Sequence, residues 1–198
     1  MRYKKLGNSD IYVSVIGFGT QNFGTTIKNK NEVFEIIQLA IDNGITLFDT
    51  AEIYPSPISL KLPGLSEIML GEYLEKNKNR QKIIISTKIA GGYKDWFSPP
   101  VRNGKTFLNI EQIKKAFFDS LKRLKTDYID IYTLHWDDSS SSFDDIIGEL
   151  NQLIKNGYLR YIAISNFKQN RIFQFLNKFN ETNENNSFIT IQNPFSLL

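Results

Sequence analysis

The stretch DIYTLHWDD, residues 130–138, contains the only histidine of the chain. His135 ends an apolar run in which Ile129, Ile131 and Leu134 are typical of a buried strand. A tryptophan, two aspartates and four serines follow it, as in a polar loop. The sequence therefore places its one imidazole at the point where a core strand meets a loop.

Apolar strands and amphipathic helices alternate along the rest of the chain. The expected strands are apolar runs bounded by turn residues, and they span residues 13–20, 45–50, 82–88, 127–135, 159–165 and 187–193. The expected helices have apolar residues at helical spacing, and they span residues 29–44, 66–77, 109–125, 142–157 and 168–179. Two short segments around the turn GNSD, Tyr3–Leu6 and Ile11–Val13, predict an N-terminal β-hairpin.

Strands that are joined by helical crossovers imply a parallel sheet and an α/β fold. Two architectures fit this order, a doubly wound sheet and a (β/α)8 barrel, and the pattern leaves both open. No Pro/Gly-rich linker divides the chain, so residues 1–198 are expected to form a single domain. Asn109 with Gln112, and Ser142 with Asp145, have capping-box spacing and predict where two helices begin.

Composition excludes several classes of protein. A hydrophobic fraction of 41% with 13% aromatic residues favours a packed core over disorder. The net charge of only +3, without a basic block, indicates no nucleic-acid partner. The absence of cysteine excludes thiolate metal sites, and with one histidine no metal site is expected. No apolar run approaches the roughly 18 residues of a membrane helix, and the start MRYKKLGNSD lacks a secretory pattern. We therefore expect a cytoplasmic protein without membrane insertion.

In either architecture, function lies at the carboxyl ends of the strands. Asp49, Tyr54, Lys88 and His135 stand at such ends and are expected to converge on one rim. Each residue taken alone also has a structural explanation, as a turn residue, loop packing, a solvated strand end or a hydrogen-bonded histidine. The stretch GFGTQNFG has its glycines at positions 17, 19 and 24, which does not match the G-x-G-x-x-G dinucleotide motif.

Together these side chains suit the reduction of a carbonyl group. A phenol with a pKa near 10 is a weak acid unless its phenolate is stabilised. Near a protein surface, an ammonium about 4 Å from a phenolate attracts it by on the order of 4 kcal/mol. Lys88 is therefore expected to lower the pKa of Tyr54. Asp49 would hold Lys88 charged, His135 would orient the carbonyl, and Tyr54 would protonate its oxygen. No side chain supplies hydride, so a nicotinamide cofactor is implied.

The same motifs resemble those of the aldo-keto reductases. DTAEIY, STK, LHW, SNF and IQNP follow the family's order, and the likeness covers essentially the whole chain. The stretches AEIYPSP, GLSEIMLGEYLE and TIQNPFSLL are most similar to the bacterial Tas-like branch. The resemblance implies a TIM (β/α)8-type barrel. It also implies NADPH-dependent reduction of an aldehyde or ketone to an alcohol, with Tyr54 as general acid.

The resemblance further implies roles for individual residues. The catalytic tetrad would be Asp49, Tyr54, Lys88 and His135. The NADP(H) cofactor would contact Ser165, Asn166 and Gln192 through its carboxamide, and Gly19, Thr20 and Asp49 near its ribose. The pocket for a small carbonyl substrate would be walled by aromatic residues that could equally pack in the core or a loop, namely Phe23, Trp96 and Trp136.

One departure from the family is large. A complete barrel has eight strands in about 250 residues, whereas this sequence predicts six strands in 198 residues. The last two βα units, which in the family carry the phosphate-binding residues, are not expected here. We therefore expect a truncated barrel of low stability that associates through open sheet edges and binds NADPH weakly. The alternative is a catalytically incomplete fragment, or a regulatory protein similar to potassium-channel β subunits.

Overall fold

The computed structural model describes residues 1–57, 62–94, 99–182 and 187–194. Every strand, helix and hairpin that the sequence predicts is present. In chain order the elements are β1 (Tyr3–Lys5), β2 (Tyr12–Ser14), β3 (Phe18–Gly19), α1 (Lys30–Asp42), β4 (Leu47–Asp49), α2 (Leu65–Asn77), the 3-10 helix η1 (Arg80–Lys82), β5 (Ile84–Ile89), the 3-10 helix η2 (Arg102–Gly104), α3 (Ile110–Leu124), β6 (Ile129–Leu134), α4 (Phe143–Lys155), β7 (Leu159–Ser165), α5 (Gln169–Thr182) and β8 (Phe188–Gln192).

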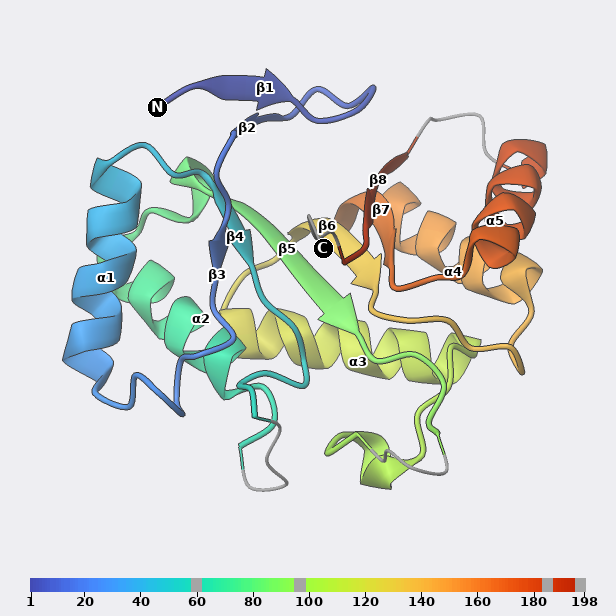
Figure 1. Ribbon diagram of the computed structural model, residues 1–198, viewed down its shortest axis with the longest axis horizontal. Coiled ribbons are helices and arrows are strands. Elements are labelled where there is room, and N and C mark those ends of the chain that lie inside the picture. Colours follow the sequence, from blue (N-terminus) through green and yellow to red (C-terminus); the bar gives the residue numbers. More distant parts are fainter. Residues whose placement is uncertain (58–61, 95–98, 183–186, 195–198) are drawn as a thin grey trace.

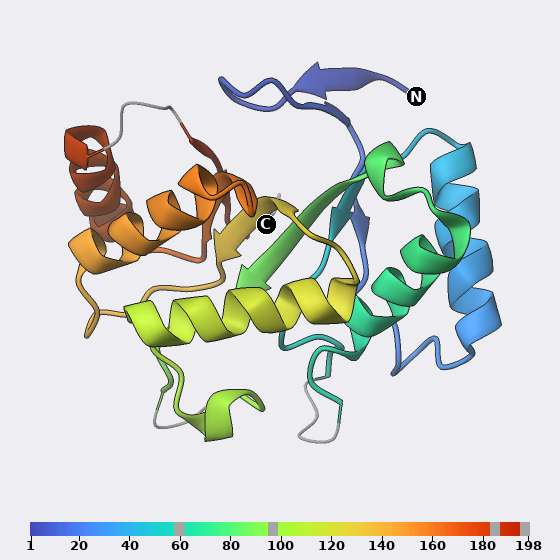
Figure 2. The same ribbon diagram turned by 180° about the vertical axis from the view of Figure 1, so that it is seen from behind.

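The six strands β3 to β8 form one parallel sheet in which each strand pairs with the next along the chain. The sheet is curled, and helices α1 to α5 cover its convex side (Figures 1 and 2). A doubly wound sheet would carry helices on both faces. The barrel prediction is therefore confirmed, as a six-stranded half-barrel with an antiparallel hairpin, β1–β2, over the amino ends of the strands (Figure 1).

The first strand of the sheet is shorter than the apolar run at residues 13–20 predicts. Only Phe18–Gly19 pairs with β4. Val13 and Ser14, at the start of the same run, pair instead with β1 in the hairpin. The prediction was wrong here because one apolar run contributes to two different sheets.

The predicted starts of two helices are confirmed. The Asn109 side chain accepts a hydrogen bond from Gln112 N at 2.9 Å, and the Ser142 hydroxyl accepts one from Asp144 N at 3.2 Å. The side chain of Gln112 does not complete a reciprocal box. Its carbonyl oxygen accepts instead from Arg102 Nε at 2.8 Å and from Phe107 N at 2.9 Å, which fastens the loop that precedes α3.

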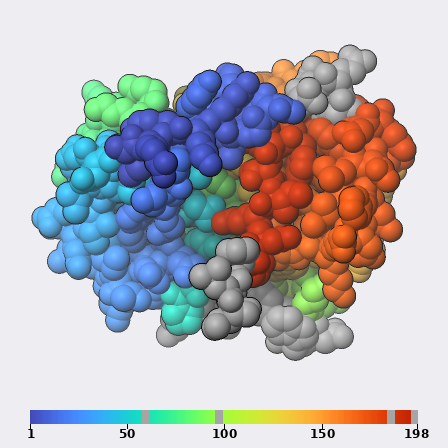
Figure 3. Space-filling model, turned by 45° about the horizontal axis from the view of Figure 1, so that its top comes forward, coloured from blue at the N-terminus to red at the C-terminus, as the bar shows by residue number. Residues whose placement is uncertain are grey.

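The main core lies between the convex face of the sheet and the helices. Strand residues such as Phe48 and Tyr132 point into it, because side chains alternate between the two faces of a strand. A smaller apolar cluster on the concave face contains Ile131, Ala163 and Ile189. This cluster borders a hollow of about 340 Å³, which Figure 3 shows between the blue N-terminal residues and the red residues of β8.

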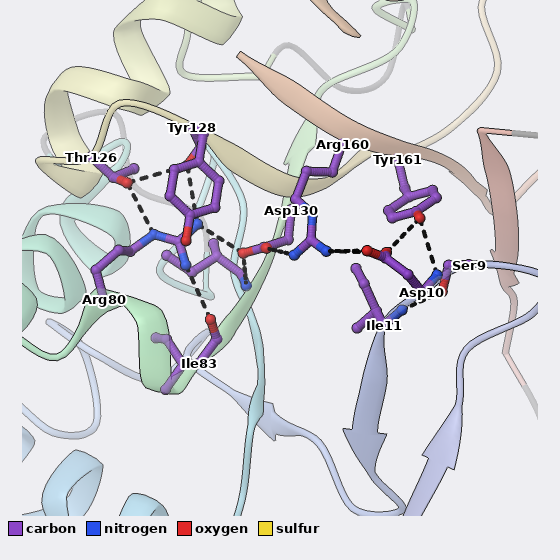
Figure 4. A network of polar contacts seen from close by, with 11 residues as sticks. Ser9, Asp10, Ile11, Arg80, Ile83, Thr126, Tyr128, Asp130, Arg160 and Tyr161 are labelled. Carbon is purple, nitrogen blue, oxygen red and sulfur yellow. Dashed lines mark hydrogen bonds and ion pairs between the residues drawn. The ribbon is translucent and has the colours of Figure 1, made fainter. Parts of the chain in front are cut away.

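A buried carboxylate joins three elements at the amino ends of the strands (Figure 4). Asp130 is the second residue of β6, and its side chain is only 1% exposed. It accepts hydrogen bonds from Arg80 Nη2 at 2.7 Å, from Arg160 Nη1 at 2.8 Å and from Ile85 N at 3.0 Å. A buried charge requires such partners, so the beginnings of β5, β6 and β7 are held together at this point.

The same network reaches the N-terminal hairpin through Asp10 (Figure 4). Arg160 Nη2 contacts the Asp10 carboxylate at 3.1 Å, and the Tyr161 hydroxyl donates to it at 2.6 Å. The hydrogen bond from Tyr161 lowers the pKa of Asp10; burial opposes this shift, and the Arg160 charge adds to it. The hairpin is thus attached to the start of β7.

Replacing Asp130 by Asn should destabilise the fold, because Arg80 and Arg160 would lose the carboxylate that they share. Removing one partner of a buried ion pair costs about 3–5 kcal/mol. Since Arg160 is partly exposed, we expect a loss of about 3 kcal/mol in the free energy of unfolding. Urea denaturation measures this loss.

The matched control is Asp119→Asn, which removes exposed ion pairs with Lys115 and Lys122. It should change the free energy of unfolding by less than about 0.5 kcal/mol. Equally small effects of the two variants would show that the Asp130 network does not anchor the sheet.

Candidate active site

Parallel pairing brings the expected catalytic residues to one rim. Asp49 ends β4, Lys88 lies near the end of β5, and His135 directly follows β6. A cavity of about 240 Å³ at this rim is lined by Tyr54, Lys88, His135, Ser165, Asn166, Gln192, Asn193 and Pro194. Asp49 lines the adjoining hollow on the concave face together with Gln192. The structure thus brings together the four residues that the sequence singled out.

Lys88 and Asp49 form a buried ion pair at the rim. The Lys88 side chain is 2% exposed, and its ammonium also donates to Thr50 O at 2.9 Å. Burial lowers the pKa of Lys88, while the Asp49 carboxylate opposes that shift. Asp49 therefore serves the predicted purpose of holding Lys88.

Tyr54 lies against His135 and Lys88 in this cavity. Its ring centroid is 5.7 Å from that of His135, edge to face, and 5.1 Å from Lys88 Nζ. Burial and the nearby Asp49 carboxylate raise the pKa of Tyr54 to about 12. The expected lowering of this pKa was wrong, because desolvation of the phenol and the charge of Asp49 both favour the protonated form.

His135 is held as a neutral imidazole. Burial and the positive charge of Lys88 lower the pKa of His135 to about 3. Its backbone N–H donates to Ile89 O at 2.9 Å, which fixes the residue beside the end of β5. Its Nδ1 atom is buried and has no hydrogen-bond partner among the described residues.

Asn166 ties together the ends of three neighbouring strands. It has a left-handed backbone, with φ of 55°, and its side-chain amide donates to His135 O at 2.9 Å and to Ser165 Oγ at 3.0 Å. Its backbone N–H donates to Asn193 Oδ1 at 2.8 Å and to Gln192 O at 3.2 Å. The predicted cofactor residues Ser165, Asn166 and Gln192 are therefore neighbours on the cavity wall.

Gly19 and Thr20, which were expected near a ribose, adjoin Asp49. The backbone N–H of Thr20 donates to Asp49 O at 2.9 Å, and its hydroxyl contacts the same oxygen at 3.2 Å. Thr20 is fully buried, so its hydroxyl supports the backbone of Asp49. Gly19 is exposed and lines the hollow on the concave face.

The three expected wall residues have different positions. Phe23 is not at the rim: it is 1% exposed in the main core and packs against Phe18 at 5.9 Å between ring centroids. The backbone N–H of Phe23 donates a hydrogen bond to Thr20 O, and this turn precedes the buried Phe23 ring. Trp96 lies outside the described residues. Trp136 is half-buried, and its ring centroid is 5.1 Å from that of His135.

Two residues without a predicted role, Glu52 and Arg102, hold the rim in place. The Glu52 carboxylate accepts from Ala90 N at 2.6 Å and from Arg102 Nη1 at 2.5 Å, and the Glu52 backbone N–H donates to Lys88 O at 3.1 Å. Burial raises the pKa of Glu52, and Arg102 opposes that rise. In the sequence, the position of Glu52 between two apolar residues of DTAEIY could have indicated a structural role. Nothing in the sequence indicated a role for Arg102.

The two aspartates that follow Trp136 have structural partners. Asp137 pairs with Arg171 at 2.7 Å. Asp138 accepts from Leu108 N at 2.8 Å and from the Ser140 hydroxyl at 2.6 Å.

Within the described ranges, no group of three or more His, Cys, Asp or Glu side chains could hold a metal ion. No helix in the same ranges is long and apolar enough to cross a membrane.

Because His135 is the only histidine, NMR can follow its titration without ambiguity. With a pKa of about 3 in the folded protein, its ring should stay neutral from about pH 8 to about pH 4, whereas an ordinary histidine titrates near 6.5. Below about pH 6.5 the unfolded chain binds a proton that the folded chain does not. The free energy of unfolding should therefore fall by up to about 1.4 kcal/mol per pH unit as the pH drops towards the folded pKa.

Long-range ¹H–¹⁵N spectra measure the ring titration, and chemical denaturation at several pH values measures the stability. This contribution to the pH dependence should disappear in His135→Gln. A folded-state titration between about pH 6 and about pH 7 would contradict the buried, neutral ring.

Comparisons with known proteins agree with this architecture. A model of the Aldo/keto reductase family matches residues 15–198. Protein tas of Escherichia coli is 32% identical over 221 residues, an alignment that covers 100% of this chain and 61% of that protein. The uncharacterized oxidoreductase YqkF of Bacillus subtilis is 33% identical over 201 residues, covering 100% of this chain and 57% of that protein.

A solved structure gives the same result in three dimensions. Aldo-keto reductase AKR11C1 from Bacillus halodurans, in its holo form, matches with a TM-score of 0.80 and 31% identity, over 100% of this chain and 59% of that one. The chain thus spans about six tenths of the length of the relatives that it matches. By family match, sequence identity and fold, the chain belongs to the aldo/keto reductase family.

Proposed function

We propose that the protein carrying this chain is an NADPH-dependent reductase that converts an aldehyde or ketone to an alcohol at this rim. Membership of the aldo/keto reductase family supports an oxidoreductase. One observation carries the proposal: a phenol, a buried ammonium and a neutral imidazole, from Tyr54, Lys88 and His135, line one cavity of about 240 Å³. NADP(H) in place of NAD(H), and a cytoplasmic location, are part of the proposal and rest on the sequence and its family resemblance.

The other residues of the cavity fit a nicotinamide. A carboxamide has a carbonyl acceptor and N–H donors, and hydroxyl and amide side chains can pair with both. Ser165, Asn166 and Gln192 supply these groups on the wall next to His135. A Cβ on Gly19 would meet no atom of the described residues within 4 Å, which leaves room among them beside Asp49 for a ribose. When bound there, a reduced nicotinamide supplies hydride.

His135 would orient the substrate carbonyl. A neutral imidazole has one N–H group and one acceptor nitrogen. Its buried Nδ1 is unpaired among the described residues, and buried N–H groups are rarely left unpaired. We therefore assign the proton to Nε2, from which it can be donated to a carbonyl oxygen in the cavity.

Tyr54 would provide the proton. With a pKa of about 12, its phenol stays protonated at neutral pH. An alkoxide is a much stronger base than a phenolate, so transfer of this proton becomes favourable as negative charge develops on the substrate oxygen. The Lys88 ammonium, with Nζ 5.1 Å from the ring centroid, would then stabilise the phenolate that remains.

Replacing Tyr54 by Phe removes this proton and should lower the rate of carbonyl reduction by about 10²-fold or more. The assay follows the oxidation of NADPH by an aromatic aldehyde in the protein that carries this chain. Cofactor affinity, measured by fluorescence titration, should change little, because the phenol acts in the transition state.

Tyr158→Phe is the matched control, since it removes a phenol from an exposed ring outside the cavity. It should leave both the rate and the cofactor affinity unchanged. Turnover by Tyr54→Phe at the rate of this control would contradict the assignment of Tyr54 as general acid.

A further inference from the structure

A second and larger cavity adjoins the proposed active site. It has a volume of about 600 Å³, which is within the usual range for small-molecule sites. Asn166 lines both this cavity and the smaller one that contains Tyr54 and His135. Trp136, which also lines the larger cavity, contacts His135. A molecule in the larger cavity would therefore lie next to the wall that carries the proposed reacting groups.

The charges on the wall of the larger cavity do not balance. Its basic residues are Lys94, Lys168 and Arg171, and Asp137 is its acidic residue. Arg171 and Asp137 neutralise each other in a two-point contact, with Nε–Oδ2 at 2.7 Å and Nη2–Oδ1 at 3.0 Å. Among the residues that the structure describes, neither lysine ammonium forms an ion pair. Two positive charges thus face the cavity without a counterion from the described chain.

These two charges come from different loops at the carboxyl side of the sheet. Lys94 lies in the segment after β5, and Lys168 directly precedes α5. The Trp136 ring lines the same cavity and contacts His135, and its Nε1 donates to Gly92 O at 2.8 Å. This hydrogen bond holds the indole in place, and the ring gives the cavity an apolar wall. The cavity therefore combines an apolar wall near the reacting groups with two cations.

We infer that the carbonyl substrate carries an anionic group, such as a carboxylate, which binds to Lys94 and Lys168 while its apolar part lies on Trp136. This inference rests on the proposed function, because it names the class of substrate for the same rim. Opposite charges favour the anion at this surface, and salt screens the attraction. Neutral carbonyl compounds of the same shape would bind more weakly.

The test uses 4-carboxybenzaldehyde and its uncharged methyl ester as probes. Isothermal titration and NMR shifts of the protein amides measure their binding, which requires no turnover. We expect the acid to bind about tenfold more tightly than the ester at low salt, as two exposed charge contacts would give. The double variant Lys94→Gln/Lys168→Gln should bind the two probes equally.

The control is Lys82→Gln/Lys155→Gln, which removes the same net charge from exposed residues outside the cavity. It should keep the preference for the acid. The inference is overturned if the wild type binds acid and ester equally, if it binds neither, or if the preference survives in Lys94→Gln/Lys168→Gln.

Turnover separates this inference from the proposed function. Reduction of both aldehydes with equal efficiency would contradict the charge preference alone. Tight, lysine-dependent binding of the acid without reduction of any aldehyde would contradict the proposed function alone.

Discussion

The chemistry at the rim depends on one buried charge, the ammonium of Lys88. A buried ammonium is stable only when it is paired, and Asp49 with the carbonyl of Thr50 provides its partners. The pair joins the ends of β4 and β5. Burial, together with the positive member of the pair, lowers the pKa of His135, and burial, together with the negative member, raises the pKa of Tyr54. The protonated phenol and the neutral imidazole of the proposed mechanism therefore follow from burial and from this ion pair.

A stabilising network and the proposed active site lie at opposite ends of the same strand, β6. Asp130, at the amino end of β6, accepts hydrogen bonds from two arginines and belongs to the network that reaches the hairpin. His135 follows the carboxyl end of that strand and lines the cavity. This division is typical of (β/α)8 barrels, in which one face supports the fold and the other carries the active site. In this half-barrel, of which β3 and β8 are the edges of the described sheet, the Asp130 network and the proposed active site lie at opposite ends of the strands.

The order of elements could be predicted from the sequence because helical and strand periodicity are local properties. Asn109 shows this well, since its position before an apolar helical pattern was sufficient to locate the start of α3. Features that depend on long-range packing were not accessible. The run at residues 13–20 is shared between two sheets, and the ring of Phe23 turns into the core. The pKa of Tyr54 rises because of burial, and the partner of Glu52 lies 50 residues away in the sequence.

We propose that this rim directs hydride from a nicotinamide to a carbonyl carbon. The most direct test supplies reduced NADP, labelled with deuterium at the transferring position, and an aromatic aldehyde to the protein that carries this chain. Mass spectrometry and NMR then locate the label. If the proposal holds, the alcohol carries one deuterium on its carbinol carbon, delivered to a single face of the aldehyde. Alcohol without the label, or no alcohol while cofactor and aldehyde both bind, would contradict it.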